Sequence, residues 1–130
     1  DFTQPGNWHD NDEFIGAGLN NANVPIKNLQ QANARVTLSS DWDVSSLNPF
    51  VGIQNAVTRT PQNISLEDAI KAYTINGAYV MRQENEVGSL ERGKVADFII
   101  INQNLFDIPT SKISETKVLN TYLEGELIYQ

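Results

Sequence analysis

Residues 34–41 read ARVTLSSD, a β-branched, partly apolar run that ends in two serines and an aspartate. Such a run is typical of a strand whose polar end marks where the strand stops. A break follows, and then Asn48-Pro49 pairs a capping residue with Pro at a first helical position. Barrel enzymes of alternating strands and helices place catalytic groups at this end of a strand. Asp41 is therefore the first candidate for a functional residue.

Apolar residues at helical spacing lie on both sides of residues 34–41. Apolar residues predict one helix from Pro25 to about residue 32 and a second that begins at Pro49 and ends before Thr60-Pro61. Ser65 begins an approximate capping box, and the helix after it is predicted to continue past Gly77 to Met81.

The pattern changes near Gln83. Residues 95–101 are predicted to form an apolar strand, and the runs 118–123 and 127–129 form a predicted hairpin in which Gly125 supplies a positive φ. Helices thus dominate the first two-thirds of the chain and strands the last third. We divide the chain into residues 1–84 and 85–130.

Composition narrows the class of protein. The chain has 130 residues, of which 40% are hydrophobic, as in an ordinary globular domain. The formal net charge is −7 and the charges are scattered, which argues against a nucleic-acid partner because such binding needs a basic face. No apolar run reaches the roughly 20 residues that span a bilayer, so we expect no membrane segment.

The chain contains no cysteine, so it has neither disulfides nor thiolate metal ligands. We expect a cytoplasmic location and leave export open. The chain does not begin with Met, and its first residues already resemble a strand. We therefore expect it to be part of a longer protein.

Residues 88–94 read GSLERGK and match the first seven positions of a phosphate-binding loop. The eighth position is Val95 in place of Ser or Thr, and a strand is predicted to follow where a helix is required. We reject nucleotide binding. We expect Gly88 and Gly93 to supply turn geometry, and Lys94 and Asp97 to satisfy polar groups or to pair.

On spacing alone, two roles stay open for Asp41. Its carboxylate could bind a divalent metal or take a proton from metal-bound water. It could also cap a turn through its side chain, and spacing alone favours this second role.

Several segments together resemble the C-terminal third of the amidohydrolase superfamily, and most closely its family-three branch of N-acyl amino acid deacetylases and long-chain amide hydrolases. The resemblance covers nearly the whole chain from residue 4 onward, and its most specific part is the glycine, lysine and aspartate pattern of residues 88–97. The segments are SSDWDV (39–44), AVTR (56–59), SLEDA (65–69), YTINGA (73–78), GSLERGKVAD (88–97) and TYLEG (121–125).

The resemblance implies an α/β fold: the C-terminal fragment of a (β/α)8 TIM barrel with the C-terminal strands of a small composite β-sandwich. Residues 1–84 would hold barrel strands seven and eight and the helices after them, and residues 85–130 the sandwich portion. The implied activity is hydrolysis of amide, N-acyl or cyclic amide C–N bonds with a divalent metal, for which we expect zinc. Asp41 matches the eighth-strand aspartate that ligates metal and acts as general base. The other metal ligands of the family lie upstream of this chain, so we expect the fragment alone to be inactive and to hold no complete metal site.

Three further residues are candidates for contacting a small-molecule amide substrate. His9, with Asp10 and Asp12 beside it, makes a poor zinc site on its own but could face substrate from a loop. Trp42 could line the pocket or simply pack against other residues. Arg59 recurs in the branch and could contact substrate, or it could interact with the dipole at a helix C-terminus.

A second interpretation is a non-catalytic, truncated relative that acts as an interaction module. In either case an open piece of a barrel leaves strand edges and apolar helix faces uncovered. We therefore expect self-association or binding to the missing barrel portion.

Overall fold

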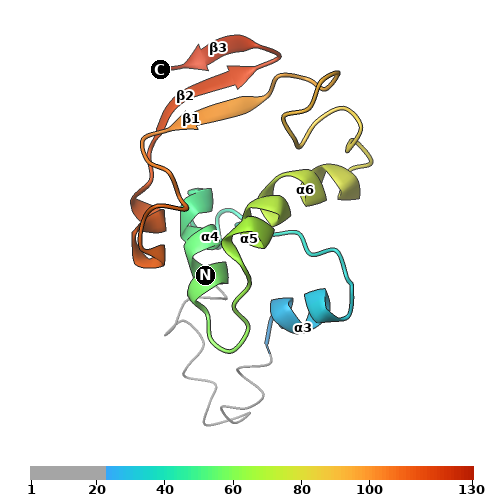
Figure 1. Ribbon diagram of the computed structural model, residues 1–130, viewed down its shortest axis with the longest axis vertical. Helices are drawn as coiled ribbons and strands as arrows, with labels where there is room; N and C mark the ends of the chain where they lie inside the picture. The colour runs from blue at the N-terminus through green and yellow to red at the C-terminus, as the bar shows by residue number, and fades with distance from the viewer. Residues whose placement is uncertain (1–22) are drawn as a thin grey trace.

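The computed structural model describes residues 23–130. Figure 1 shows a group of short helices with a small sheet above one end of it and the C-terminus on that sheet. The predicted order, helices first and strands last, is confirmed. The elements are α3 (Ile26–Gln31), α4 (Pro49–Thr58), α5 (Leu66–Tyr73), α6 (Ile75–Val80), β1 (Phe98–Ile101), the 3-10 helix η2 (Thr110–Glu115), β2 (Val118–Leu123) and β3 (Glu126–Tyr129).

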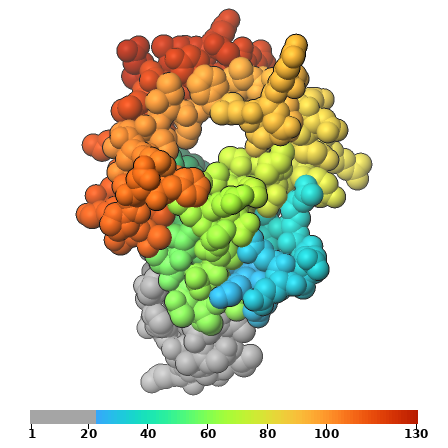
Figure 2. Space-filling model, in the orientation of Figure 1, coloured from blue at the N-terminus to red at the C-terminus, as the bar shows by residue number. Residues whose placement is uncertain are grey.

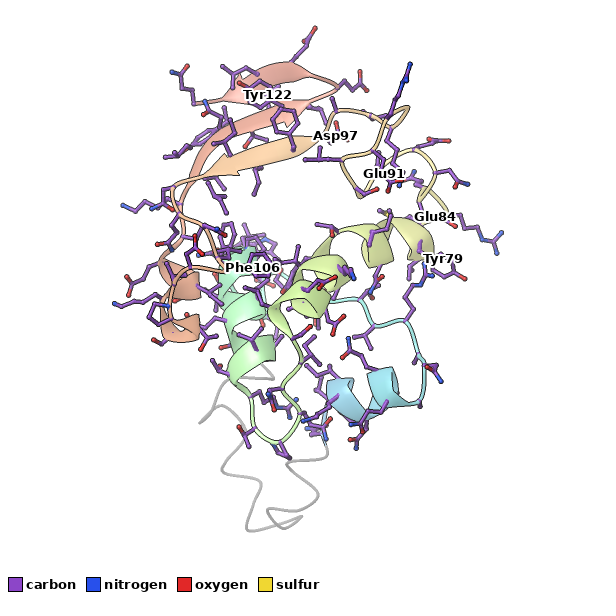
Figure 3. The ribbon with its side chains drawn as sticks, in the orientation of Figure 1. Tyr79, Glu84, Glu91, Asp97, Phe106 and Tyr122 are labelled. Carbon is purple, nitrogen blue, oxygen red and sulfur yellow. The ribbon has the colours of Figure 1, made fainter. Side chains whose placement is uncertain are left out.

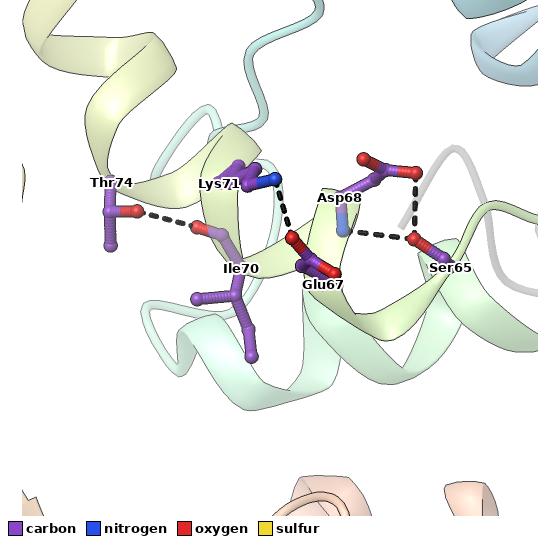
Figure 4. A network of polar contacts seen from close by, with 6 residues as sticks. All are labelled: Ser65, Glu67, Asp68, Ile70, Lys71 and Thr74. Atoms are coloured by element: carbon purple, nitrogen blue, oxygen red, sulfur yellow. Dashed lines mark hydrogen bonds and ion pairs between the residues drawn. The ribbon is translucent and has the colours of Figure 1, made fainter.

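Helices α4 and α5 begin where the sequence predicts. The Asn48 side chain accepts a hydrogen bond of 3.0 Å from the backbone N–H of Phe50. Ser65 Oγ accepts one of 3.0 Å from the N–H of Asp68 and donates to the Asp68 carboxylate at 2.6 Å (Figure 4). The bonds from the Phe50 and Asp68 N–H groups each satisfy a backbone donor that has no partner within its own helix.

The helix predicted from Leu66 to Met81 is wrong in its continuity, because Thr74 interrupts it. Thr74 has φ −125° and ψ −99°, far from helical values. Its hydroxyl donates to the Ile70 carbonyl at 2.8 Å, a local bond that competes with the helical pattern (Figure 4). Val80 and Met81, predicted on the apolar face, are 65% and 61% exposed.

The hydrophobic core lies around α4. The 3-10 helix η2 packs against α4, and its Ile113 is fully buried. The Gln54 side chain accepts a bond of 2.9 Å from the N–H of Ser114 at this contact. Part of the C-terminal third thus completes the core of the helices, and the boundary near residue 84 stays a prediction. The core residues are Ile26, Phe50, Ile53, Ala56, Ile64, Ala69, Leu105 and Ile113.

The three strands form an antiparallel sheet in the order β1-β2-β3. Glu124 and Gly125, with φ of 53° and 83°, form the turn of the predicted hairpin, which is confirmed. The rings of Phe98 and Tyr122 are stacked with centroids 4.5 Å apart. Within residues 23–130 no strand packs along a helix, and Figure 2 shows an opening between the sheet and the helices below it.

The strand predicted at residues 34–38 is absent. The chain there is extended, but no described strand lies beside it to pair with its backbone. It is held against the helices, where Leu38 N donates to the Ala72 carbonyl at 3.1 Å and Asn76 Nδ2 donates to the Val36 carbonyl at 2.8 Å. Sheet pairing requires a neighbouring strand, and sequence pattern alone does not supply one. The barrel and the sandwich stay predictions.

The helices between residues 23 and 130 are too short or too polar for any of them to cross a bilayer.

Candidate functional site

Asp41 follows the extended segment and opens a tight turn. The N–H of Val44 donates to the Asp41 carbonyl at 2.7 Å, and Asp41 has φ 49° in the left-handed region. Asp and Asn adopt this region more readily than most residues. Asp41 and Asp43 are exposed, and Trp42 is 66% exposed. The carboxylate therefore lies at the surface of the described part of the chain, free to be approached by a ligand.

A carboxylate of this kind suits one position in the ligand shell of a divalent metal. Among residues 23–130, however, no three His, Cys, Asp or Glu side chains lie close enough together to hold an ion. Asp41 can therefore supply one ligand, and a complete site would need ligands from outside this range. His9 lies outside the described residues.

A small open pocket lies beside the Asp41 turn, with a volume of about 130 Å³. Two serines before the turn and two after it line one side, namely Ser39, Ser40, Ser45 and Ser46. The apolar side consists of Val24, Leu38, Val51 and Ala56. Gly52 and Asn55 of α4 and Tyr73 of α5 complete the wall, so none of the lining residues within 23–130 is charged.

Two of the residues that line the pocket, Asn55 and Tyr73, are polar and at least partly buried. Asn55 is 8% exposed, and its Nδ2 has no hydrogen-bond partner among residues 23–130. Burial raises the pKa of the Tyr73 hydroxyl above its ordinary value, because ionisation would place a charge in a poorly hydrated place. A Cβ at Gly52 would lie 1.9 Å from Tyr73 Oη, so the absence of a side chain at Gly52 lets the phenol approach α4.

Sequence reasoning did not single out Asn55 or Gly52. The available signal is the position of Asn55 on α4: it is buried among the apolar residues Phe50, Ile53 and Ala56. A polar amide at a core-facing position needs a partner, and such a position is a candidate for a functional or structural contact.

Arg59 lies at the C-terminal end of α4 and is not among the described residues that line the pocket, although it contacts one of them, Val24. Its guanidinium donates to the backbone carbonyls of Asn23 and Val24, the latter at 2.8 Å. Partial burial lowers the pKa of Arg59. The side chain thus links α4 to the chain that enters α3. Roles in substrate binding for Arg59, Trp42 and His9 stay predictions.

The loop of residues 88–97 has the structural role expected of it. Lys94 Nζ donates to Ser89 Oγ at 2.6 Å and lies 3.4 Å from a Glu91 carboxylate oxygen. The hydrogen bond from Ser89 to Glu91 lowers the pKa of Glu91, and Lys94 lowers it further. Gly88 and Gly93 both have positive φ. Figure 3 shows Glu91 and Asp97 on the segment that leads from α6 toward the sheet.

The sequence profile of the Amidohydrolase family matches residues 3–129. The chain belongs to the amidohydrolase family. The protein LONG AFTER FAR-RED 3 of Arabidopsis thaliana is 37% identical over 80% of the chain and 19% of its own length. The N-substituted formamide deformylase of Arthrobacter pascens is 30% identical over 82% of the chain and 21% of its length. The amidohydrolase chain described here therefore spans about a fifth of the length of these relatives.

Solved structures agree with the family. An amidohydrolase from Thermotoga maritima superposes with a TM-score of 0.67 and 26% identity, over 81% of this chain and 25% of that one. The guanine deaminase of E. coli superposes with a TM-score of 0.65 at 18% identity, over 80% of this chain and 29% of that one. The second likeness concerns the fold alone.

Proposed function

We propose that this amidohydrolase chain is the C-terminal part of a longer metal-dependent hydrolase, in which Asp41 ligates the metal and serves as general base. The observation that carries the proposal is the exposed carboxylate of Asp41 at the end of the extended segment 34–40. The family match over residues 3–129 and a relative named as a formamide deformylase support it. The substrate class is a small molecule with an amide, N-acyl or cyclic amide bond.

In this proposal zinc or another divalent metal would polarise the scissile carbonyl and lower the pKa of water. Asp41 would hold the ion through its carboxylate. It would also accept the proton of the attacking water and deliver it to the leaving nitrogen. An exposed carboxylate in a turn has room for both contacts, and no cation in the described part of the chain is paired with it.

The proposed context is the end of a (β/α)8 barrel for residues 1–84 and a β-sandwich portion for residues 85–130. Two features support a larger assembly. The extended segment 34–40 lacks a sheet partner among the described strands. The sheet also carries exposed apolar residues on both faces, with Ile99 and Leu123 on one and Ile100 and Leu127 on the other. The remainder of the protein or a second copy would cover these surfaces.

The test is a hydrolase assay on the longer protein that contains this chain, purified with zinc. N-acyl amino acids, formamides and cyclic amides are incubated with it, and release of the amine or the acid is followed. Hydrolysis that is lost with a chelator and restored with metal supports the proposal. If metal-loaded protein hydrolyses none of the three classes, the alternative of a non-catalytic interaction module is favoured.

A further inference from the structure

Asp41 is proposed to bind a metal and to move a proton, and both tasks require its carboxylate to be held in place. A catalytic side chain works only within about 0.5 Å of its productive position. Asp41 is exposed, and its backbone carbonyl closes a turn by accepting the N–H of Val44 at 2.7 Å. The contacts that fix this turn therefore determine what Asp41 can do.

The turn that carries Asp41 leads directly into the first residues of α4. Asn48 lies between the two, and its backbone N–H donates to Ser46 Oγ at 3.1 Å. The Asn48 side chain accepts the N–H of Phe50 at 3.0 Å and so caps α4. Phe50 is buried in the core. The position of the turn thus depends on the position of the start of α4.

The 3-10 helix η2 contacts α4 at two points through one residue, Ser114. The N–H of Ser114 donates to Gln54 Oε1 at 2.9 Å, and the Ser114 carbonyl accepts from Asn48 Nδ2 at 3.4 Å. Asn48 and Gln54 are six residues apart, which is about 9 Å along a helix axis. Because the two contacts are made at separate points, they fix the orientation of α4 as well as its distance from η2.

The helix η2, drawn in dark orange beside α4 in Figure 1, is itself anchored to the core and to the end of β1. Ile113 is fully buried, and its carbonyl accepts from Thr116 Oγ1 at 2.6 Å. Thr116 Oγ1 also accepts from Gln103 Nε2 at 2.9 Å. Just beyond β1, the N–H of Asn102 donates to the Lys117 carbonyl at 3.0 Å. A connected network with buried members is rigid, so η2 provides a fixed support for α4.

We propose that η2 is a brace that positions Asp41: Gln54 and Asn48 bind Ser114, and these contacts fix the start of α4 and the turn of residues 41–47. Gln54 and Asn48 are positioning residues in this proposal, because they contact η2 and act on the chemistry only through Asp41. The inference deepens the proposed function and rests on it. A residue 73 positions after Asp41 thus supports the active site of the proposed hydrolase.

The experiment uses the longer protein, purified with zinc, and removes one contact at a time. Gln54→Leu removes the acceptor for the Ser114 N–H, and Gln54→Glu keeps an acceptor of the same shape. Asn48→Ser keeps a good helix cap but has a shorter side chain that no longer reaches Ser114. Asp97→Ala is the matched control, because it also removes the side-chain acceptor of one backbone N–H, that of Glu124 at the β2–β3 turn.

Four quantities are measured: kcat and KM for hydrolysis, the affinity for zinc by competition with a chelator, and backbone hydrogen exchange in the peptide of residues 41–48. Loss of a residue that supports a metal ligand lowers metal affinity or activity by about 10–100-fold. Gln54→Leu and Asn48→Ser should lower kcat and the zinc affinity by about tenfold, with KM nearly unchanged and exchange accelerated. Gln54→Glu should restore kcat, zinc affinity and exchange. Asp97→Ala should lose stability in urea and keep all three.

A contact that is merely structural lowers stability without changing the folded enzyme. Equal kcat and zinc affinity in Gln54→Leu and Asp97→Ala would therefore overturn the inference, as would a failure of Gln54→Glu to restore them. Asn48→Ser provides the same comparison should Gln54→Leu fail to fold.

Hydrogen exchange keeps the two proposals apart. If the unchanged longer protein hydrolyses no substrate, the proposed function is lost and exchange alone decides the inference. Unaltered exchange of residues 41–48 in Gln54→Leu then overturns it, and faster exchange that Gln54→Glu reverses supports it. If hydrolysis is observed and the Gln54 and Asn48 variants match Asp97→Ala, the proposed function stands and only the brace is wrong.

Discussion

Asp97 accepts a hydrogen bond of 2.8 Å through Oδ1 from the backbone N–H of Glu124, and so ties the start of β1 to the β2–β3 turn. The neighbouring N–H of Gly125 donates to the Ala96 carbonyl at 3.0 Å. Two adjacent residues of the turn are thus bonded to two adjacent residues that lie 27 and 29 positions earlier in the chain. The aspartate of the 88–97 pattern therefore has a structural role in this fold.

Replacing Asp97 should weaken the sheet. Asp97→Ala removes the acceptor for the Glu124 N–H, and a net loss of about 0.5–1.5 kcal/mol in the free energy of unfolding is expected. Asp97→Asn keeps one carbonyl oxygen and should lose less. Urea denaturation of both variants measures the difference. Equal stability of Asp97→Ala and the unchanged chain would mean that the hydrogen bond contributes nothing.

Position 88 favours glycine for two reasons: the backbone has a positive φ, and neighbouring atoms leave no room for a side chain. It has φ +90°, and a Cβ there would lie 2.7 Å from the Ala78 Cβ and 3.0 Å from the Ile75 Cα. Gly93 has a similar φ of +97°, but a Cβ there would have nothing within 4 Å. Gly93→Ala should therefore cost about 1–2 kcal/mol, for backbone strain alone. Gly88→Ala should cost more, by about 1–3 kcal/mol of overpacking.

Thermal or chemical unfolding of the two alanine variants checks the ranking. A reversed order would contradict the close packing of the 88–97 loop on α6.

Asn55 and Asn76 can be compared directly, because both carry a side-chain amide; Asn55 is buried and Asn76 is half-buried. Asn76 Nδ2 donates to the Val36 carbonyl, so Asn76→Leu should destabilise the chain by about 1–2 kcal/mol. Asn55 Nδ2 has no such partner in the described part of the chain, so Asn55→Leu should leave the stability unchanged or raise it by up to about 1 kcal/mol. Denaturant unfolding compares them. A loss in Asn55→Leu as large as that in Asn76→Leu would show that the Asn55 amide is structural.

Local signals explain which parts of the fold could be predicted. The starts of α4 and α5 depend on Asn48 and Ser65 and their near neighbours, and the hairpin depends on Gly125; all are readable in short windows. The break at Thr74 was missed because the apolar spacing runs through it. The packing of η2 on α4 joins segments about 60 residues apart, as in the bond between Ser114 and Gln54, and no local pattern reports it.

The candidate site divides in the same way. The sequence singles out Asp41 because the polar end of an apolar run is visible in it, and the structure places Asp41 in an exposed turn, while its role stays a prediction. The pocket beside Asp41 could not be predicted from the sequence. Its wall combines residues around that turn with Asn55 and Gly52 of α4 and Tyr73 of α5, which come from separate segments of the chain.

The buried Tyr73 hydroxyl should make the free energy of unfolding fall with rising pH once the pH exceeds the ordinary pKa of tyrosine. Burial raises the pKa of Tyr73 above the model-compound value of 10.0, so the folded state holds its proton where the unfolded state releases it. The stabilisation is fully present below pH 10 and is lost as the pH rises through the folded pKa. Unfolding measured between pH 9 and about 11 should therefore show a fall in stability that is smaller in Tyr73→Phe. Identical pH profiles for the two chains would contradict the burial of the phenol.

The proposed general base is tested by Asp41→Asn in the longer protein. Asparagine keeps the size and one carbonyl oxygen of the side chain but removes the negative charge and the site that accepts a proton. Loss of a general base lowers the rate by about 10²–10⁴-fold, and loss of a metal ligand adds to that. The free energy of unfolding should change little, because Asp41 is exposed and it is the backbone carbonyl of Asp41 that accepts the hydrogen bond from Val44.

Asp43→Asn is the matched control, since Asp43 is an exposed carboxylate two residues along in the same turn. It should alter the rate only mildly. Initial rates, metal content by atomic emission and unfolding curves are compared for the two variants. If both lose activity equally, or if Asp41→Asn keeps near-normal turnover with normal metal content, the role assigned to Asp41 is wrong. If Asp41→Asn loses its metal together with its activity while Asp43→Asn keeps both, the Asp41 carboxylate acts as a metal ligand. A pH–rate profile at saturating metal then separates that role from proton transfer.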